Sequence, residues 1–258
     1  MPNSISVTMI TRDASRFIVE SLQALDRFDE VILLDNGSTD DTIALARSFD
    51  NVTIHTSTFI GFGPLKNLAV SYAKNEWILS VDSDEVLSEA LVDEILSLSL
   101  SSREVYTILR DNYYDQRVMR CCGWENDYVL RLFNREKLSF NQNQVHESLV
   151  VPPDVKTIRL HHTMKHYTYQ NSEQLIAKMQ YYSTLWAIDH QGKKRSSPLK
   201  AVIRSIFAFV KFYLFKKGFM SGYEGLLICV TNTNAVFYKY MKLYELNKKE
   251  KDLDADSY

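Results

Sequence analysis

The stretch Trp77-Ile78-Leu79-Ser80-Val81-Asp82-Ser83-Asp84-Glu85 decides the fold. Its apolar beginning, Trp77 to Val81, has the length and composition of a buried β-strand. Two carboxylates, Asp82 and Asp84, follow it directly. In open α/β sheets, ligands bind at the carboxyl ends of the strands, so the stretch predicts a strand that ends at a ligand site.

The two carboxylates are spaced to act together. A spacing of two residues on a strand directs both side chains to the same face. Two negative charges this close repel each other unless a cation lies between them, and hard oxygen ligands suit Mg²⁺ or Mn²⁺. Short acidic triplets also occur in ordinary surface turns, so the surrounding sequence must decide between a metal site and a turn.

The composition is that of an ordinary globular protein. The chain has 258 residues, of which 45% are hydrophobic and 24% charged, enough for one large domain with an appendage. Its net charge of −2 gives no reason to expect nucleic acid as a partner. Three cysteines, with Cys121 and Cys122 adjacent, form neither a disulfide framework nor a zinc-ligand spacing. With no signal-peptide pattern at the start, we expect a cytoplasmic protein.

The first 85 residues alternate between strand and helix patterns. This order predicts a parallel sheet with helices on both faces. The expected strands are Ile5–Thr11, Glu30–Asp35, Val52–Thr56 and Trp77–Val81, and the expected helices are Ala14–Leu25, Asp40–Phe49 and one that follows the Gly61–Pro64 loop through Lys74.

After Asp84 the pattern changes to strands that extend the sheet antiparallel and then to helices. We therefore predict a mixed α/β domain over residues 1–168 and a helical region over residues 169–258. The expected strands are Val105–Leu109, Tyr128–Phe133, Ser148–Val151 and Thr157–His161, and the expected helices are Ser88–Ser99, Gln174–His190, Pro198–Lys216 and Gly222–Glu245.

A second acidic loop follows the second strand, with the sequence Asp35-Asn36-Gly37-Ser38-Thr39-Asp40-Asp41-Thr42. A carboxylate at a strand's carboxyl end accepts hydrogen bonds from a base N–H, such as the imide of uracil. Because Asp35 shares a sheet edge with the acidic triplet, we prefer a nucleotide-binding role for it. For Ser38, Thr39 and Asp40 we expect helix capping instead.

Together, the Asp-Asn-Gly-Ser-Thr-Asp-Asp-Thr and Val-Asp-Ser-Asp-Glu motifs resemble family 2 glycosyltransferases with a GT-A fold. A Gly-rich loop and a helix carrying Lys66-Asn67 stand between them, as in that family. The resemblance covers about the first 165 residues. It implies a Rossmann-like mixed sheet, a nucleotide-sugar donor, a divalent metal and inversion at the anomeric carbon.

The resemblance also implies roles for individual residues on the donor side. Arg12-Asp13 departs from the Lys-Asn or Tyr-Asn pair of many relatives, which weakens the analogy at the first strand. The implied contacts are Thr11 and Asp35 to the nucleoside, Lys66 to the base or ribose, Asp82 to the ribose side, the Ser83 backbone to the nucleotide, and Asp84 to the metal on the diphosphate.

An inverting transfer needs a general base near the acceptor hydroxyl. By family analogy that base is Asp127, where Asn126 replaces the usual Glu of the motif; Glu125 is a nearby alternative, and so is a purely structural turn at Asp127. Trp124 either stacks on a sugar ring or belongs to the core. Arg131 pairs with a carboxylate or with the diphosphate.

A third motif is Val145-His146-Glu147. A neutral imidazole at His146 either completes the metal shell or is structural, and Glu147 is the alternative base. The pairing of Arg-Leu-Phe at 131–133 with Val-His-Glu resembles the bacterial branch that glycosylates the lipopolysaccharide inner core.

Residues 191–217 hold eight lysines and arginines, no acid and many aromatic side chains. Such a basic amphipathic segment is typical of an interfacial helix on an anionic membrane, and the alternative is a helix packed on the catalytic domain. We favour membrane contact, at the inner face of the inner membrane.

These observations predict a metal-dependent inverting hexosyltransferase. It would move glucose from UDP-glucose to a heptose of a lipid-linked inner-core acceptor. Transfer to a capsule or another polyprenyl-linked glycan is the alternative within the class. A sugar nucleotidyltransferase would need a glycine-rich phosphate loop after the first strand, and Thr11-Arg12-Asp13-Ala14-Ser15 has no glycine. A non-catalytic nucleotide-sugar binding module would not need Asp127.

Overall fold

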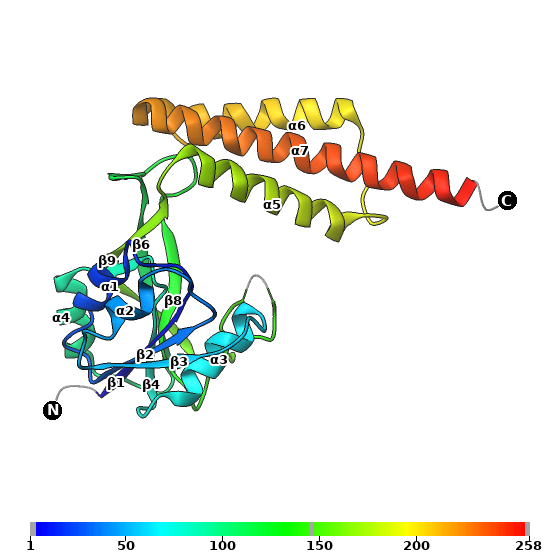
Figure 1. Cartoon of the computed structure of the whole chain (residues 1–258). Helices are drawn as coiled ribbons and strands as arrows, with labels where there is room; N and C mark the ends of the chain where they lie inside the picture. Colours follow the sequence, from blue (N-terminus) through cyan, green and yellow to red (C-terminus); the bar gives the residue numbers. More distant parts are fainter. Residues whose placement is uncertain (1–3, 145–146, 256–258) are drawn as a thin grey trace. The chain divides into compact units, whose positions relative to one another are not determined.

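The computed structural model describes residues 4–144 and 147–255. The chain forms two compact units (Figure 1). The first unit comprises Met1–Asp111 and Asn126–His166, and the second comprises Asn112–Glu125 and Tyr167–Tyr258. The assignment of residues 1–168 as the catalytic domain and of 169–258 as a separate helical region stays a prediction.

The strands form one mixed sheet in the order β3-β2-β1-β4-β8-β6-β9-β5, with β7 beside β6. Strands β3, β2, β1 and β4 are parallel, and β8 joins β4 antiparallel, followed by β6. The predicted mixed sheet is therefore confirmed. The strands are β1 Ile5–Thr11, β2 Glu30–Asp35, β3 Val52–Thr56, β4 Trp77–Ser80, β5 Glu85–Leu87, β6 Glu104–Tyr114, β7 Arg117–Val118, β8 Asp127–Asn134 and β9 Lys156–Tyr169.

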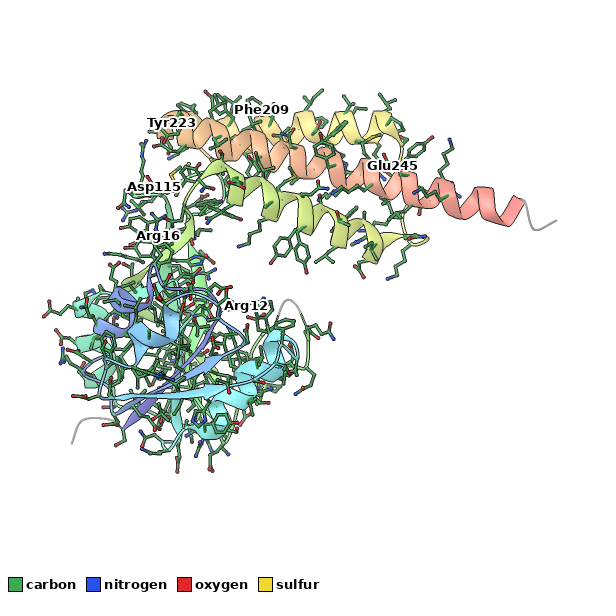
Figure 2. The ribbon with its side chains drawn as sticks, viewed as in Figure 1. Arg12, Arg16, Asp115, Phe209, Tyr223 and Glu245 are labelled. Carbon is green, nitrogen blue, oxygen red and sulfur yellow. The ribbon has the colours of Figure 1, made fainter. Side chains whose placement is uncertain are left out.

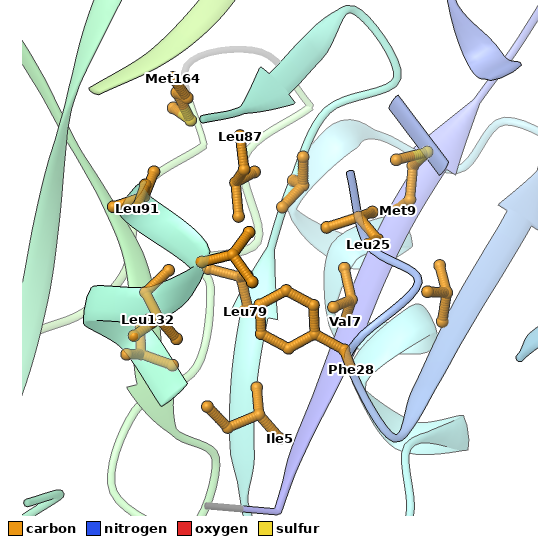
Figure 3. Close-up of a cluster of buried hydrophobic side chains, with 14 of the residues drawn as sticks. Ile5, Val7, Met9, Leu25, Phe28, Leu79, Leu87, Leu91, Leu132 and Met164 are labelled. Carbon is orange, nitrogen blue, oxygen red and sulfur yellow. The ribbon is translucent and has the colours of Figure 1, made fainter. Parts of the chain in front are cut away.

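Alternation along the buried strands separates the two faces of the sheet. Val7 and Met9 of β1 point to one face, where they join Leu79 of β4 and the side chains of helices α1 (Ile18–Gln23) and α4 (Glu89–Ser97). Figure 3 shows Phe28 among these side chains. This cluster is the main core, and truncating the fully buried Leu79 to alanine would cost about 2–5 kcal/mol.

Helix α3 (Phe62–Tyr72) covers the opposite face, where Leu65 and Ala69 pack on Leu34 of β2. The first turn of α3 approaches the backbone of residues 141–144. A Cβ at Gly63 would lie 2.0 Å from the carbonyl oxygen of Asn141, so no larger residue fits there. The N–H groups of Phe62 and Gly63 donate to the carbonyls of residues 144 and 143. This close approach fixes the helix that carries Lys66.

Three long helices make up most of the second unit (Figure 1). Helices α5 (Ser172–His190) and α6 (Pro198–Val210) both pack against α7 (Gly222–Ala255). The helix expected through Lys216 instead ends its α-helical part at Val210 and widens into a π-helical turn over Lys211–Phe215. A 3-10 helix, Gly218–Ser221, precedes α7, which continues beyond its expected end.

The first unit also contains a short helix α2 (Thr42–Ala46). Helices α1, α2 and α4 are shorter than the sequence predicted, whereas α3 begins at Phe62, inside the predicted loop, and ends at Tyr72. Within the part of the chain that the structure describes, no helix has the length and apolar character to cross a membrane.

The second unit buries a cluster of three thiols. The sulfur of Cys122 lies 3.1 Å from that of Cys121 and 3.3 Å from that of Cys229, and none of the three forms a disulfide. Met119 and Ile228 complete this small core. Burial raises the pKa of the Cys122 and Cys229 thiols, which keeps them protonated and unreactive.

Candidate functional site

The carboxyl ends of β2, β1 and β4 meet at one edge of the sheet. Strand β1 pairs in parallel with β2 on one side and with β4 on the other, so the direction in which strands are added reverses at β1. Thr11 and Asp35, the last residues of β1 and β2, are register partners. This reversal creates the crevice in which open α/β sheets bind ligands.

The Asp35 carboxylate is buried and held by its own loop. It accepts hydrogen bonds from the N–H groups of Gly37 and Ser38, both at 3.2 Å, and from the Ser38 hydroxyl at 2.5 Å. Gly37 has a φ of 105°, a conformation that favours glycine. Beside it, the buried atoms Thr11 Oγ1 and Asn36 Oδ1 have no hydrogen-bond partner within the described residues. Such atoms are costly unless a ligand pairs with them.

The loops after β1 and β2 are tied together by side chains. Asp13, which has a left-handed φ of 49°, accepts a bond from the Thr39 N–H at 2.7 Å and donates its own N–H to the Ser38 hydroxyl at 2.9 Å. Asp40 accepts from the Ser15 N–H. Arg12, the neighbour of Asp13 in the sequence, is exposed (Figure 2).

The expected capping is present only in part. Asp40 Oδ1 accepts a hydrogen bond from the N–H of Thr42, the first residue of α2, at 3.0 Å, whereas Asp41 makes no capping bond and Ser38 is engaged by Asp35 and Asp13. A hydrogen bond from the Thr42 hydroxyl holds the pKa of Asp40 well below its usual range. The unusual Arg12-Asp13 pair has a structural role, because Asp13 fastens the two ligand-side loops.

Seven charged side chains form one continuous chain of ion pairs in the first unit, which we call the charged chain. Negative and positive groups alternate along it, so each charge lies between charges of opposite sign except at the two ends. Its members in order are Glu147, Lys66, Asp82, Arg131, Glu85, Arg110 and Asp127.

Lys66, on α3, is held between two carboxylates. Its Nζ lies 3.0 Å from Asp82 Oδ1 and 3.0 Å from Glu147 Oε1, and 5.5 Å from the centre of the Phe140 ring. Its side chain is 5% exposed. A buried ammonium group needs such partners, because leaving it unpaired would cost several kcal/mol, about 3–5.

Both carboxylate oxygens of Asp82 are engaged, since Arg131 Nη2 lies 2.5 Å from Oδ2. Burial alone would raise the pKa of Asp82, but the charges of Arg131 and Lys66 hold it well below its usual range. Burial would likewise lower the pKa of Arg131, and Asp82 and Glu85 raise it instead. Of the two alternatives for Arg131, the structure has the carboxylate pairing.

Glu85 is fully buried and joins the two halves of the charged chain. It contacts Arg131 Nη2 and lies 3.3 Å from Arg110 Nη1. Arg110 in turn directs Nε and Nη2 to Asp127 Oδ2, at 2.9 and 2.7 Å. Arg110 and Asp127 are register partners on β6 and β8, so the sheet itself sets this pair. The two carboxylates assigned to donor and acceptor are thereby linked.

Asp82 and Asp84 do not point the same way, contrary to the strand-based expectation. Strand β4 ends at Ser80, and the chain turns at residues 83–84. The Glu85 N–H donates to the Asp82 carbonyl and the Asp82 N–H to Glu85 Oε2, both at 3.0 Å. A period of two no longer applies inside this turn, and Asp84 instead faces His166, with 3.6 Å between Oδ2 and Nε2.

Asp84 is more exposed than Asp82, whose side chain is 30% exposed. The Asp84 side chain is 40% exposed, and His166 adds a nitrogen donor. Within residues 4–144 and 147–255, no group of three or more His, Cys, Asp or Glu side chains is arranged to hold an ion. One or two protein ligands are nevertheless what Mg²⁺ uses when substrate phosphates supply the rest, so these residues fit such an ion. His146 lies outside the described residues.

Trp124 and Glu125 belong to the second unit. Trp124 packs beside Tyr169, with 5.6 Å between ring centroids, next to the thiol cluster. Lys216 lies 2.7 Å from Glu125 and, although burial acts in the opposite direction, lowers its pKa. Glu125 is thus engaged within its own unit.

The histidines of β9 lie in two environments. His161 bonds to Glu94 through its ring and its N–H, and the His162 N–H bonds to the same carboxylate. His166 instead lies beside Asp84.

Two residues of this region were not singled out by sequence: Glu85 and Arg110. Glu85 was visible as a third acid after a buried strand, and Arg110 as a charge extending an apolar strand pattern. Their partners come from distant parts of the chain, which sequence spacing does not reveal.

Comparison with known proteins agrees with this architecture. Residues 6–137, half of the chain, match the model of Glycosyl transferase family 2. An uncharacterized glycosyltransferase of Rickettsia typhi, RT0209, is 30% identical over 98% of this chain and 91% of its own length. The chain therefore belongs to glycosyltransferase family 2, as the two acidic motifs predicted.

Two further likenesses are more distant. The lipopolysaccharide core biosynthesis glycosyltransferase LpsC of Rhizobium meliloti is 24% identical over 93% of this chain and 92% of its own. Among solved structures, that of S. aureus TarS 1–349 overlaps 99% of this chain and 92% of its own, with 13% identity and a TM-score of 0.47.

Proposed function

We propose that this chain is an inverting, metal-dependent hexosyltransferase of GT-A type that acts on the lipopolysaccharide inner core. The observation that carries the proposal is the charged chain, which links a nucleotide-side carboxylate, Asp82, to a candidate base, Asp127. Similarity to LpsC along nearly the whole of both chains supports the choice of lipopolysaccharide core as acceptor. Glucose from UDP-glucose and a heptose acceptor are the specific substrates that we propose.

The donor nucleoside would bind at the ends of β1 and β2. The unpartnered Thr11 hydroxyl and Asn36 amide oxygen lie next to Asp35, which supports hydrogen bonding to a polar ring such as uracil. Lys66, fixed between Asp82 and Glu147, adds positive charge near the ribose and diphosphate. The backbone of Ser83, in the turn between the two aspartates, would contact the nucleotide.

A divalent cation, Mg²⁺ or Mn²⁺, would be held by Asp84, with His166 as a second donor. When bound, such an ion neutralises the charge that develops on the leaving diphosphate. Asp84→Ala should therefore remove the gain in UDP affinity that Mn²⁺ produces. Calorimetry with and without Mn²⁺ measures this, and an unchanged gain would contradict the assignment.

On the acceptor side, Asp127 would accept the proton of the attacking hydroxyl. Its carboxylate is 30% exposed and is oriented by two N–H groups of Arg110. Glu147 is paired with the buried Lys66, so we propose it as a structural partner of the donor side rather than the base. Attack from the face opposite the leaving group inverts the anomeric carbon without a covalent intermediate.

A donor screen tests the proposed function. UDP release is measured with UDP-glucose, UDP-galactose and UDP-N-acetylglucosamine, each with purified lipopolysaccharide truncated after the inner-core heptoses. We expect turnover with UDP-glucose that requires the heptose-bearing acceptor and Mn²⁺ or Mg²⁺. Turnover only with a polyprenyl-linked acceptor would favour the capsule alternative, and binding of UDP with no turnover on any acceptor would favour a non-catalytic module.

We also propose that the second unit contacts an anionic membrane, which would place the enzyme at the cytoplasmic face of the inner membrane beside its lipid-linked acceptor. Large apolar side chains along α6 are exposed, including Ile206 at 59% and Phe207 at 69%, and Phe215 follows at 78%. Figure 2 shows side chains extending from α6 on the side away from α7, near the labelled Phe209. Residues 191–217 add eight basic groups and no acid, which complements anionic lipid.

Vesicle binding tests the membrane proposal. Phe207→Ser with Phe215→Ser should weaken binding to phosphatidylglycerol vesicles by about tenfold or more, since burying each ring is worth about 1.5–3 kcal/mol. Phe59→Ser, at a residue 50% exposed in the first unit, is the matched control and should bind like wild type. Equal binding by all three proteins, or no preference for anionic over zwitterionic vesicles, would contradict the proposal.

A further inference from the structure

We propose that Glu85 is a positioning residue that couples the donor side of the site to its acceptor side. The inference rests on the proposed transferase function and goes beyond it by naming a residue that touches neither substrate. Glu85 lies next to Asp84 but, being 0% exposed, is unavailable to a metal or a nucleotide.

The first part of the argument is the turn that Glu85 closes. Its backbone N–H donates to the Asp82 carbonyl, and its side-chain Oε2 accepts from the Asp82 N–H, both at 3.0 Å. This reciprocal pair fixes the backbone from Asp82 to Glu85. The direction in which Asp84 leaves the sheet is thereby set by the Glu85 side chain.

The second part is the other oxygen of the same carboxylate. Glu85 Oε1 receives both Arg131, which also holds Asp82, and Arg110, which also holds Asp127. Two guanidinium groups this close repel each other, and the negative charge between them makes the arrangement possible. Without the charge of Glu85, Arg131 would keep only Asp82 and Arg110 would keep only Asp127. The donor and acceptor sides of the site would then no longer be held in a fixed relative position.

The conservative substitution Glu85→Gln retains the size of the side chain and removes its charge. We expect it to weaken UDP binding and to lower turnover of UDP-glucose, each by about tenfold or more, because small misplacements of reacting groups have effects of this size. Arg110→Gln cuts only the acceptor half of the link. It should lower turnover to a similar degree and leave UDP affinity within about twofold of wild type.

Glu30→Gln is the matched control for a buried carboxylate. Glu30 is 4% exposed and lies in the same sheet, at the start of β2 and away from the ligand edge. It accepts hydrogen bonds from the Ser6 hydroxyl and the Lys74 N–H. It should reduce thermal stability and leave UDP affinity and turnover unchanged.

Calorimetry with UDP, the UDP-release assay and thermal unfolding on all four proteins decide the matter. The proposal is supported if Glu85→Gln loses both UDP binding and turnover while Arg110→Gln loses turnover and keeps its UDP affinity. A folded Glu85→Gln variant with wild-type binding and turnover overturns it, as does an equal loss in Glu30→Gln. If Glu85→Gln does not fold, Arg110→Gln alone decides, and wild-type turnover there overturns the proposal. Failure of the proposed function would appear instead in the wild-type protein, as absence of UDP binding or as absence of turnover on every acceptor.

Discussion

The first unit buries several charged side chains, whereas the second unit exposes many large apolar side chains and buries thiols. The charged chain places Lys66, Glu85 and Arg131 at 6% exposure or less. In the second unit, Phe207 and Phe215 are exposed while Cys121, Cys122 and Cys229 are buried. Burying charges is costly and is seldom explained by stability alone, so the first unit has the character of a site for polar ligands. Exposed apolar side chains indicate a surface that contacts another phase or molecule.

The largest expected effect falls at the acceptor end of the charged chain. Asp127→Asn should reduce turnover by about 10²–10⁴-fold, the usual contribution of a general base, while UDP affinity stays near that of wild type. The UDP-release assay and calorimetry measure the two quantities. Glu147→Gln is the comparison variant, and a greater loss of turnover there than in Asp127→Asn would reassign the base.

The next effect concerns the buried cation of the first unit. Lys66→Met should lower the free energy of unfolding by about 3–5 kcal/mol, because Asp82 and Glu147 lose the charge between them. Urea denaturation measures it. Lys74→Met removes a cation that is 81% exposed and 3.6 Å from Glu30, and should change stability by at most about 0–1 kcal/mol. Equal effects of the two substitutions would mean that the charged chain is no more than a surface network.

The low pKa of Asp82 predicts how stability depends on pH. A carboxyl whose pKa is lower in the folded chain contributes stability above its unfolded pKa, about 3.9, and loses that contribution as pH falls below it. Urea midpoints at pH 7 and pH 3 should therefore show a stability difference between wild type and Asp82→Asn that shrinks at the lower pH. The exposed Asp50→Asn serves as control, and a difference that does not shrink would contradict the ion pairing.

The smallest effect tests the core of the second unit. Because Cys122 and Cys229 are buried and their pKa is raised, neither should react with a thiol reagent at pH 7.5 in the folded protein. Full labelling should appear only on unfolding in urea. Rapid labelling of the native chain would show that this core opens more readily than that of the first unit.

Several parts of the fold were predictable because they depend on neighbours in sequence. The bounds of β1, β2 and β3 match the predicted strands. The partly exposed β3 alternates apolar and polar residues, and the buried β2 leaves a continuous apolar run. Asp35 and Asp82 were placed at strand ends for the same reason. Helix bounds were less accurate. Ser38 bonds to Asp13 and Asp35 instead of capping α2, and Asp40 divides its bonds between Ser15 in the neighbouring loop and Thr42 in α2.

The sequence did not reveal interactions between residues that are far apart in the chain. The charged chain joins Lys66 of α3, Arg110 of β6 and Glu85 of β5, and only the sheet order brings them together. The divergence of Asp82 and Asp84 was missed because the strand ends two residues earlier than Asp82 and the period of two ends with it. The roles of these residues stay predictions until the variants are measured.

The segment Asn112–Glu125 has a consequence for how this chain can be divided or recombined. It belongs to the second unit although the sequence returns to the first unit for the following forty-one residues, Asn126–His166. A chain ended after residue 168 would keep Met119, Cys121 and Cys122 but lose Ile228 and Cys229, their partners in the small core. Residues 169–258 therefore cannot be removed without dividing this small core. A single crossover between genes would separate the two segments of this unit, so its exchange among relatives requires three matched breakpoints, at 111/112, 125/126 and 166/167.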